Sequence, residues 1–173
     1  MGGERFPVRR LNRMLAILLS EMQDLTDEGR ELPIRWHIMH LYSSSQLAKI
    51  VALRRGMNPE IAAIAAALHD LGDVVTQKHE SHAEAAEKPV RDFFERYHSR
   101  TEGKLPEVTV EEGEKIIKAI VKHSEKEVYS DDPLVELLKD VDSFDGYLHG
   151  VKPEGARLER CQRVMNELGI ETG

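Results

Sequence analysis

Apolar residues along this 173-residue chain recur mostly at spacings of three and four, the period of an amphipathic α-helix. The first such stripe consists of Leu11, Leu15, Leu18, Met22 and Leu25. It predicts a helix from Pro7 to about Asp27. No segment shows the strict alternation of apolar and polar residues that is typical of a half-buried strand. The pattern therefore predicts an all-α protein.

Cap and stop signals divide the rest of the chain into further helices. We predict them over Ile34–Arg55, from Asn58-Pro59 through the following apolar run, from about Ser81 to Tyr97 with a kink at Pro89, from the capping box at Thr109–Glu112, from Asp132-Pro133 to Leu148, and from Lys152-Pro153 to Leu168. We therefore expect a single domain over residues 1–173, a bundle of about seven helices whose core covers about 35–148, with the terminal helices packed on it.

One stretch, Ile61–Asp73, departs from the amphipathic pattern. Its sequence, IAAIAAALHDLGD, begins with eight apolar residues, so the helix is expected to be surrounded by other helices. His69 and Asp70 follow directly, and Gly72 is the predicted helix stop. Buried polar groups need partners. A bound cation would satisfy this pair, and so would a His–Asp hydrogen bond that seals the core.

Composition excludes several classes of protein. The chain has 24 Lys and Arg against 31 Asp and Glu, which argues against general nucleic-acid binding. Cys161 is the single cysteine, so an intramolecular disulfide and a cysteine-based zinc site are both excluded. The apolar patch Met14–Leu19 is too short to span a membrane. We expect a cytoplasmic protein with no membrane partner, and the sequence leaves open whether it forms a homo-oligomer.

The chain has eight histidines, and several of them fall at or near apolar helix faces. Such positions are held by His40, His69 and His123, and Asp142 lies on the leucine-bearing face of its predicted helix. Nitrogen and oxygen ligands without sulfur suit Mn²⁺, Fe, Co²⁺, Ni²⁺ or Zn²⁺, and also Mg²⁺ where carboxylates dominate. His123 is also consistent with a satisfied core histidine.

Four other polar residues have simpler explanations. We expect His98 and His149 at the surface. His37 is consistent with a helix-start residue that faces solvent, and Asp140 with the outer face of its helix beside Lys139.

Taken together, these residues resemble the HD superfamily of metal-dependent phosphohydrolases. The resemblance rests on HLYSSSQLA from His40, on GMNPE from Gly56, on AALHDLG up to Gly72, and on KDVDSFD from Lys139, and it covers about 35–148. It implies an all-α HD-type fold and four metal ligands. They are His40, His69, Asp70 and Asp142. His37 and Asp140 remain alternatives one turn or less away.

The resemblance also implies further roles. Some members hold a second metal with histidines between the HD pair and the last aspartate, here His79 or His82 with His123. Many members have lysine directly after HDLG, where this chain has Asp73. A carboxylate there could act as general acid or base beside a metal-bound water, or be a solvated helix-end residue. Asp73 and Asp70 are thus the candidate catalytic residues. Lys78 and Lys122 each lie next to or near a proposed ligand histidine, so they are either phosphate-binding residues or ordinary surface lysines.

The function that the resemblance implies is hydrolysis of a small phosphorylated substrate, typically a nucleotide, by a metal-activated water. One or two divalent ions would be the cofactor. Two alternatives remain. One is a dinuclear-iron oxygenase of the same superfamily, which uses four histidines and two aspartates. The other is a non-catalytic regulatory module that keeps the metal site.

Overall fold

The computed structural model describes residues 8–171, and every regular element in that range is a helix. The elements are α1 Arg9–Gln23, α2 Ile34–Arg54, α3 Pro59–Leu68, α4 Leu71–Thr76, α5 His82–Ala85, α6 Glu87–Thr101, α7 Val110–Lys122, α8 Pro133–Leu148 and α9 Gly155–Leu168. Two of them, α4 and α5, are short, so the predicted all-α bundle of about seven helices is confirmed. The predicted start of the first helix at Pro7 lies outside the described residues.

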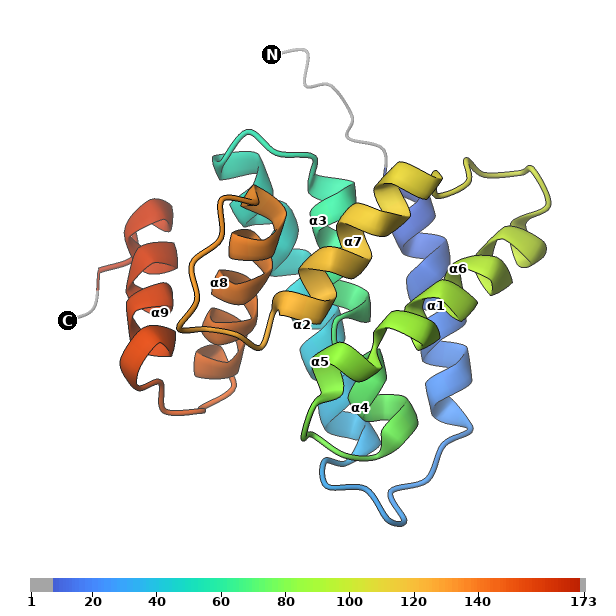
Figure 1. The fold of residues 1–173 in the computed structure, drawn as a ribbon, viewed down its shortest axis with the longest axis horizontal. Helices are drawn as coiled ribbons and strands as arrows, with labels where there is room; N and C mark the ends of the chain where they lie inside the picture. The colour runs from blue at the N-terminus through green and yellow to red at the C-terminus, as the bar shows by residue number, and fades with distance from the viewer. Residues whose placement is uncertain (1–7, 172–173) are drawn as a thin grey trace.

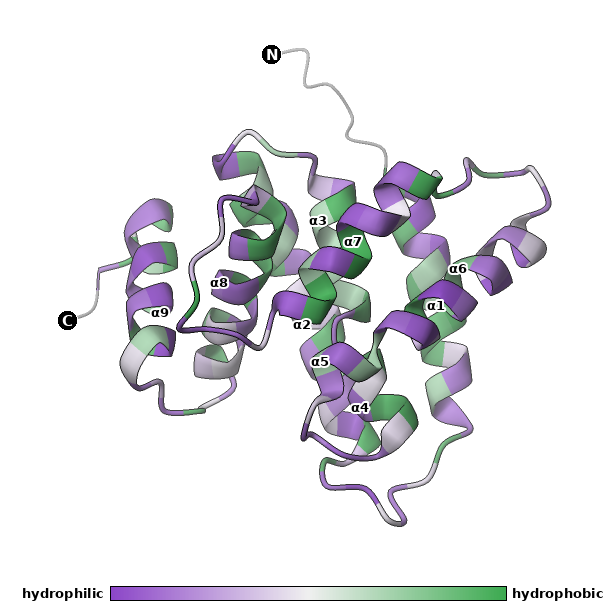
Figure 2. Cartoon of the chain, viewed as in Figure 1, coloured by the Kyte–Doolittle hydropathy of each residue, from purple (hydrophilic) through white to green (hydrophobic). Residues whose placement is uncertain are grey.

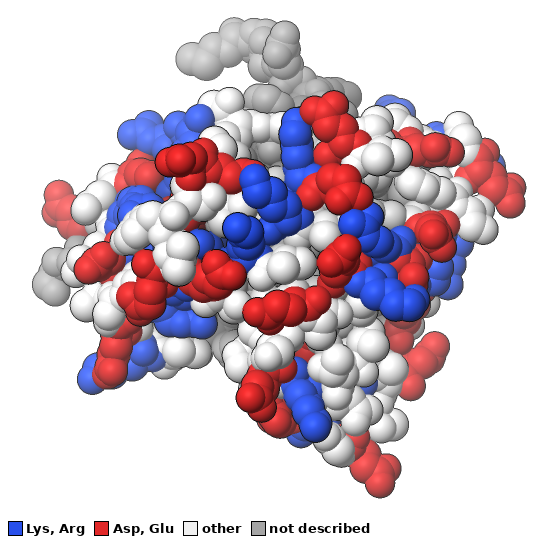
Figure 3. Space-filling view, viewed as in Figure 1, with Lys and Arg blue, Asp and Glu red and all other residues white. Residues whose placement is uncertain are grey.

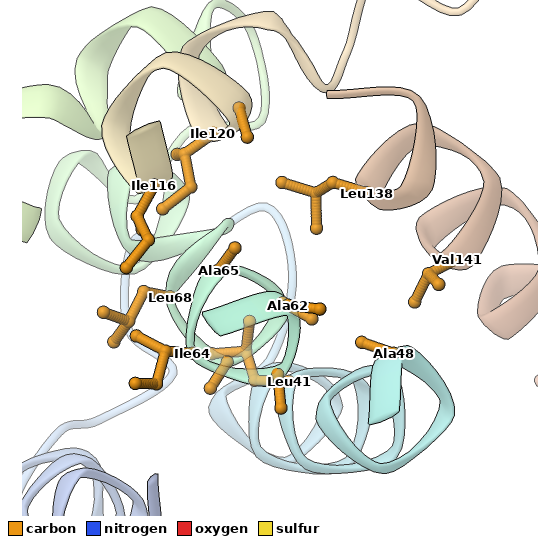
Figure 4. Close-up of a cluster of buried hydrophobic side chains, with 14 of the residues drawn as sticks. Leu41, Ala48, Ala62, Ile64, Ala65, Leu68, Ile116, Ile120, Leu138 and Val141 are labelled. Carbon is orange, nitrogen blue, oxygen red and sulfur yellow. The ribbon is translucent and has the colours of Figure 1, made fainter. Parts of the chain in front are cut away.

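Helix α3 is the centre of the bundle (Figure 1). All of its residues except Ile61 are buried, because α1, α2, α7 and α8 surround it. In Figure 4, Ala62, Ala65 and Leu68 point into a cluster that also takes side chains from α2, α7 and α8. Its alanines let these helices approach closely. At the two ends of the molecule, α9 packs on α8, and α1 lies beside α6.

The predicted cap signals are present as hydrogen bonds. The Asn58 side chain accepts from the backbone N–H groups of Glu60 and Ile61 at the start of α3. Thr109 and Glu112 form the reciprocal capping box of α7, and Asp132 caps α8. The helix that the capping box starts has both polar and apolar residues, as Figure 2 shows for α7. Local sequence therefore determines where these helices begin.

The prediction that Gly72 stops the central helix is wrong. α3 ends at Leu68, and the chain continues as α4 with Gly72 inside it. Gly72 is needed there for space. A Cβ atom on it would lie 1.9 Å from the carbonyl oxygen of His82. The glycine thus lets α5 pack directly against α4.

The predicted helix from Ser81 is divided at Ala86 into α5 and α6. Pro89 lies in the first turn of α6, where its missing N–H removes no helical hydrogen bond. The expected kink at Pro89 is therefore replaced by a break three residues earlier. This break gives α5 its own direction and places His82 against α7.

Two properties of the surface bear on partners. No helix among residues 8–171 is long and apolar enough to cross a bilayer. On the face shown in Figure 3, basic and acidic side chains are interspersed. That face thus presents no continuous basic surface of the kind that binds nucleic-acid phosphates.

Candidate metal centre

Four buried histidines from four different helices meet beside α3. His40 comes from the middle of α2, and His82 is the first residue of α5. His69 and His123 occupy equivalent places, each directly after the last residue of a helix, α3 and α7. Asp70 precedes α4, and Asp142 projects from α8. These six residues are at most 9% exposed.

The ring nitrogens of these histidines lie close together in pairs. The Nε2 atoms of His40 and His69 are 3.2 Å apart, and those of His82 and His123 are 3.1 Å apart. Asp142 Oδ1 lies 3.1 Å from His40 Nε2, and Asp70 Oδ1 lies 3.3 Å from His82 Nε2. Among the described residues, two overlapping groups can hold a metal ion, His40–His69–Asp142 and His69–Asp70–His123.

Hydrogen bonds on the opposite side of each ring determine which nitrogen carries the proton. The Nδ1 atoms of His69, His82 and His123 donate to the carbonyl oxygens of Ala66, His79 and Ile120 at 2.6–2.7 Å. His40 Nδ1 donates to Asp145 Oδ2 at 2.6 Å. In the neutral rings, all four Nε2 atoms are therefore bare acceptors.

Bare nitrogens that face each other at about 3 Å repel each other unless a cation or a proton lies between them. Imidazoles held by such second bonds are the usual ligands of Zn²⁺, Fe and Mn²⁺. The donor set therefore fits a divalent metal. His123 is not simply a core histidine with all its hydrogen bonds made, because its Nδ1 has an acceptor but its Nε2 faces the bare Nε2 of His82.

The ionisation of the cluster agrees with this arrangement. Although burial opposes it, the neighbouring rings of His69 and His82 hold the pKa of Asp70 well below its usual range. Burial and the neighbouring His69 lower the pKa of His123. Burial likewise opposes the charged form of His40, but hydrogen bonds with Asp142 and Asp145 raise its pKa to about 10. In the metal-free protein, a proton on His40 thus takes the place of the cation.

Two residues around the cluster, Asp145 and Lys126, were not identified from the sequence. Asp145 accepts from His40 and also from the Ser43 hydroxyl, at 3.0 Å. Its position three residues after Asp142, on the same helix face, was the available signal. Lys126 is buried and donates to Asp142 Oδ2 and to the carbonyl oxygen of His123. Nothing in its local sequence distinguishes it from a surface lysine.

His37 and Asp73 form a second buried pair behind the cluster. Both are fully buried, and His37 Nε2 lies 3.2 Å from Asp73 Oδ1. The expectation that His37 faces solvent is therefore wrong, and so is the alternative that Asp73 is solvated. Asp73 Oδ2 accepts from Nδ1 of His79, whose side chain is 52% exposed. Hydrogen bonds with His37 and His79 lower the pKa of Asp73 to about 2, against the effect of burial.

Asp140 is not on the outer face of α8 as expected. It is fully buried and pairs with Arg55 and Arg160, at 2.7 and 2.8 Å, away from the histidines. His149 is also largely buried, with its ring 5.3 Å from that of Trp36, and His98 is half-buried and accepts from Val108 N. These three residues were predicted to be more exposed than they are.

The cluster lies in the wall of a cavity of about 460 Å³. The residues around it are Glu31, Leu32, Trp36, His40, Asp70, His79, His82, His123, Ser124, Asp142, Gly146, Val151 and Arg157. The candidate phosphate-binding residues Lys78 and Lys122 are exposed and do not line it. The cation that does line it is Arg157, from α9.

Comparison with protein families agrees with the site. The family model of the HD domain matches residues 38–147, which is most of the chain. This protein therefore belongs to the HD domain family, a superfamily of metal-dependent phosphohydrolases. No curated protein and no solved structure matches the chain. α9 and its Arg157 lie outside the matched region.

Proposed function

We propose that this protein is a metal-dependent phosphohydrolase that acts on a small phosphorylated substrate, a nucleotide. The observation that carries the proposal is the convergence of four bare Nε2 atoms and two ionised carboxylates at one cavity, whose wall includes all of these residues except His69. We assign His40, His69, Asp70 and Asp142 as the ligands of one ion, and His82 and His123 as additional ligands for a second.

A divalent ion bound there would polarise a phosphoryl oxygen and lower the pKa of a water molecule. In the overall reaction, the water oxygen forms a bond to phosphorus and the bond from phosphorus to the ester oxygen breaks. A proton goes to the departing oxygen, so the products are inorganic phosphate and an alcohol. Asp145, by holding Nδ1 of His40, would keep the Nε2 lone pair of that ring directed at the ion.

Asp73 acts, in this proposal, through His79. Both carboxylate oxygens of Asp73 are engaged by histidines, and Asp73 does not line the cavity. His79 does line it, and its Nδ1–H is held by Asp73. His79 Nε2 is thus the atom that can exchange a proton with a substrate, and Asp73 orients the ring. We do not assign His79 to the second metal, because it is His82 whose Nε2 lies 3.1 Å from Nε2 of His123.

The support for a nucleotide comes from Trp36. It is the single tryptophan of the chain, and it lines the cavity beside the ring of His40, with the two ring centroids 5.6 Å apart. An indole face stabilises a flat aromatic group by stacking. A phosphate at the histidines and a base against Trp36 would use both parts of the cavity.

A second candidate function rests on the same residues. His40, His69, His82 and His123 with Asp70 and Asp142 form a set of four histidines and two aspartates, the set of the dinuclear-iron oxygenases in this superfamily. Iron content and oxygen consumption distinguish the candidates. Oxygen consumption without phosphate release would favour the oxygenase.

The test is a panel of nucleotides and simple phosphoesters, with the metal-loaded protein and phosphate release as readout. We expect release by the wild-type protein, and a loss of at least about a hundredfold in His69→Ala and Asp142→Ala. Activity that survives both substitutions would rule out this site. No turnover of any phosphoester or of oxygen would favour the non-catalytic module instead.

A further inference from the structure

Arg157 is a cation in the cavity wall that has no hydrogen-bond partner among the described residues. It is the one lysine or arginine among the described residues that line the cavity. Its Nη1 lies 3.8 Å from Asp142 Oδ2, and its guanidinium makes no hydrogen bond with any residue in the described range. A guanidinium has five N–H donors in a planar fork that fits two oxygens of a phosphoryl group. Arg157 thus presents unused donors beside the candidate metal ligands.

The turn of α9 that follows Arg157 is anchored to the rest of the protein by Arg160. Arg160 is fully buried and donates to Asp140, to Glu136 and to the carbonyl oxygen of Lys126. The last bond also fixes Lys126, whose amine contacts Asp142. The hydrogen bonds of Arg160 therefore hold α9, which carries Arg157, in a fixed position against α8, which carries Asp142.

The charges around the cavity limit how many phosphoryl groups it can hold. Its lining has three carboxylates, from Glu31, Asp70 and Asp142, against the one guanidinium, so the two divalent ions assigned above would bring its formal charge to about +2. A phosphomonoester carries about two negative charges near neutral pH. Each further phosphoryl group adds at least one charge for which the lining offers no cation. The volume of about 460 Å³ also lies toward the small end of ligand cavities.

We propose that Arg157 binds the phosphoryl group of the substrate and that this substrate carries a single phosphoryl group. The proposal rests on the proposed function as far as hydrolysis is concerned. Binding of phosphate by Arg157 can be measured without it.

The first experiment measures binding of inorganic phosphate to metal-loaded protein by calorimetry, with metal content determined on the same samples. We expect Arg157→Ala to bind phosphate at least about tenfold more weakly and Arg157→Lys to be intermediate, because lysine retains the charge but not the fork. Lys152→Ala is the matched control, since Lys152 is 86% exposed and five residues away, and it should bind like the wild type.

Two results would overturn the role of Arg157. One is equal phosphate affinity in Arg157→Ala and the wild type, or no phosphate binding by either. The other is loss of metal together with phosphate in Arg157→Ala, because Arg157 would then support the ligands and not the anion. The side chain is 43% exposed and has no hydrogen bond to any part of the chain that the structure describes, so this variant should melt like the wild type.

The second experiment compares the mono-, di- and triphosphates of one nucleoside. We expect kcat/KM and affinity to be highest for the monophosphate and to fall with each added phosphoryl group. An equal or higher value for the triphosphate would contradict the single-phosphoryl assignment. If none is hydrolysed, the proposed function fails, and the order of their affinities still tests the assignment.

Discussion

The Nε2 atoms of His40 and His69 lie 3.2 Å apart, although the two residues belong to different helices and are 29 positions apart in sequence. Each ring uses its Nδ1–H elsewhere, on Asp145 and on Ala66 O. Neither Nε2 can therefore donate to the other while both rings are neutral. This contact is unfavourable between two neutral rings and favourable when a cation lies between them, which is why the metal is central to our account.

Asp140 and Asp142 are separated by one residue but should have different functions. Asp142→Asn is expected to lower metal affinity by about a hundredfold or more, because it removes a charged oxygen from His40 and His69. Asp140→Asn removes one of the negative charges that neutralise the buried Arg160, and it should lower the free energy of unfolding by about 3–5 kcal/mol. It should leave the metal content of the folded protein unchanged.

Denaturant unfolding and elemental analysis check both variants. If Asp140→Asn loses its metal while circular dichroism shows that it is folded, then Asp140 is a metal ligand and our assignment of Asp142 alone is wrong.

Gly72→Ala should be severely destabilising. The new Cβ would overlap the carbonyl oxygen of His82 at 1.9 Å, so α5 must move and take His82 away from His123. We expect a loss of about 3 kcal/mol or more in the free energy of unfolding, as for other strongly overpacked sites. Thermal and urea unfolding of the metal-free protein measure it.

Gly113→Ala in α7 is the matched control. Its Cβ would meet Phe94 at 3.8 Å, an ordinary contact, so the variant should be unchanged or more stable by about 0.5–1 kcal/mol. Similar stabilities for the two alanine variants would mean that α5 does not pack on Gly72 as described.

The metal-free protein should become less stable as the pH rises above neutral. The folded state raises the pKa of His40 from about 6.5 to about 10. A raised pKa stabilises the fold fully below about pH 6.5, and this contribution is lost as the pH rises through 10. Within that window, the slope contributed by His40 should approach about 1.4 kcal/mol per pH unit.

Urea unfolding at several pH values, compared with His40→Gln, isolates this contribution. Saturation with metal should abolish it, because the ion replaces the proton. The same pH dependence in His40→Gln would show that other groups cause it.

Local signals predicted much of the fold, and long-range packing explains what they missed. Asn58, Thr109 and Asp132 mark helix starts because a cap is a contact between residues two or three apart. The position of Arg157 in the cavity wall depends instead on how α9 packs on α8, and no short segment of sequence specifies that packing. His37 was placed in solvent for the same reason, since it is covered by α4, 34 residues or more further along the chain. Gly72 was read as a stop because the close approach of α5 is a tertiary contact.

Metal content is the most direct test of the central claim. The purified protein is incubated with Mn²⁺, Fe²⁺, Co²⁺, Ni²⁺, Zn²⁺ or Mg²⁺ in turn, desalted, and assayed by elemental analysis beside His69→Ala and Lys152→Ala. We predict at least one tightly held ion per chain for at least one metal in the wild type and in Lys152→Ala, and a large loss in His69→Ala. A folded wild-type protein that retains none of these metals, or a His69→Ala variant that retains as much as the wild type, would contradict the account.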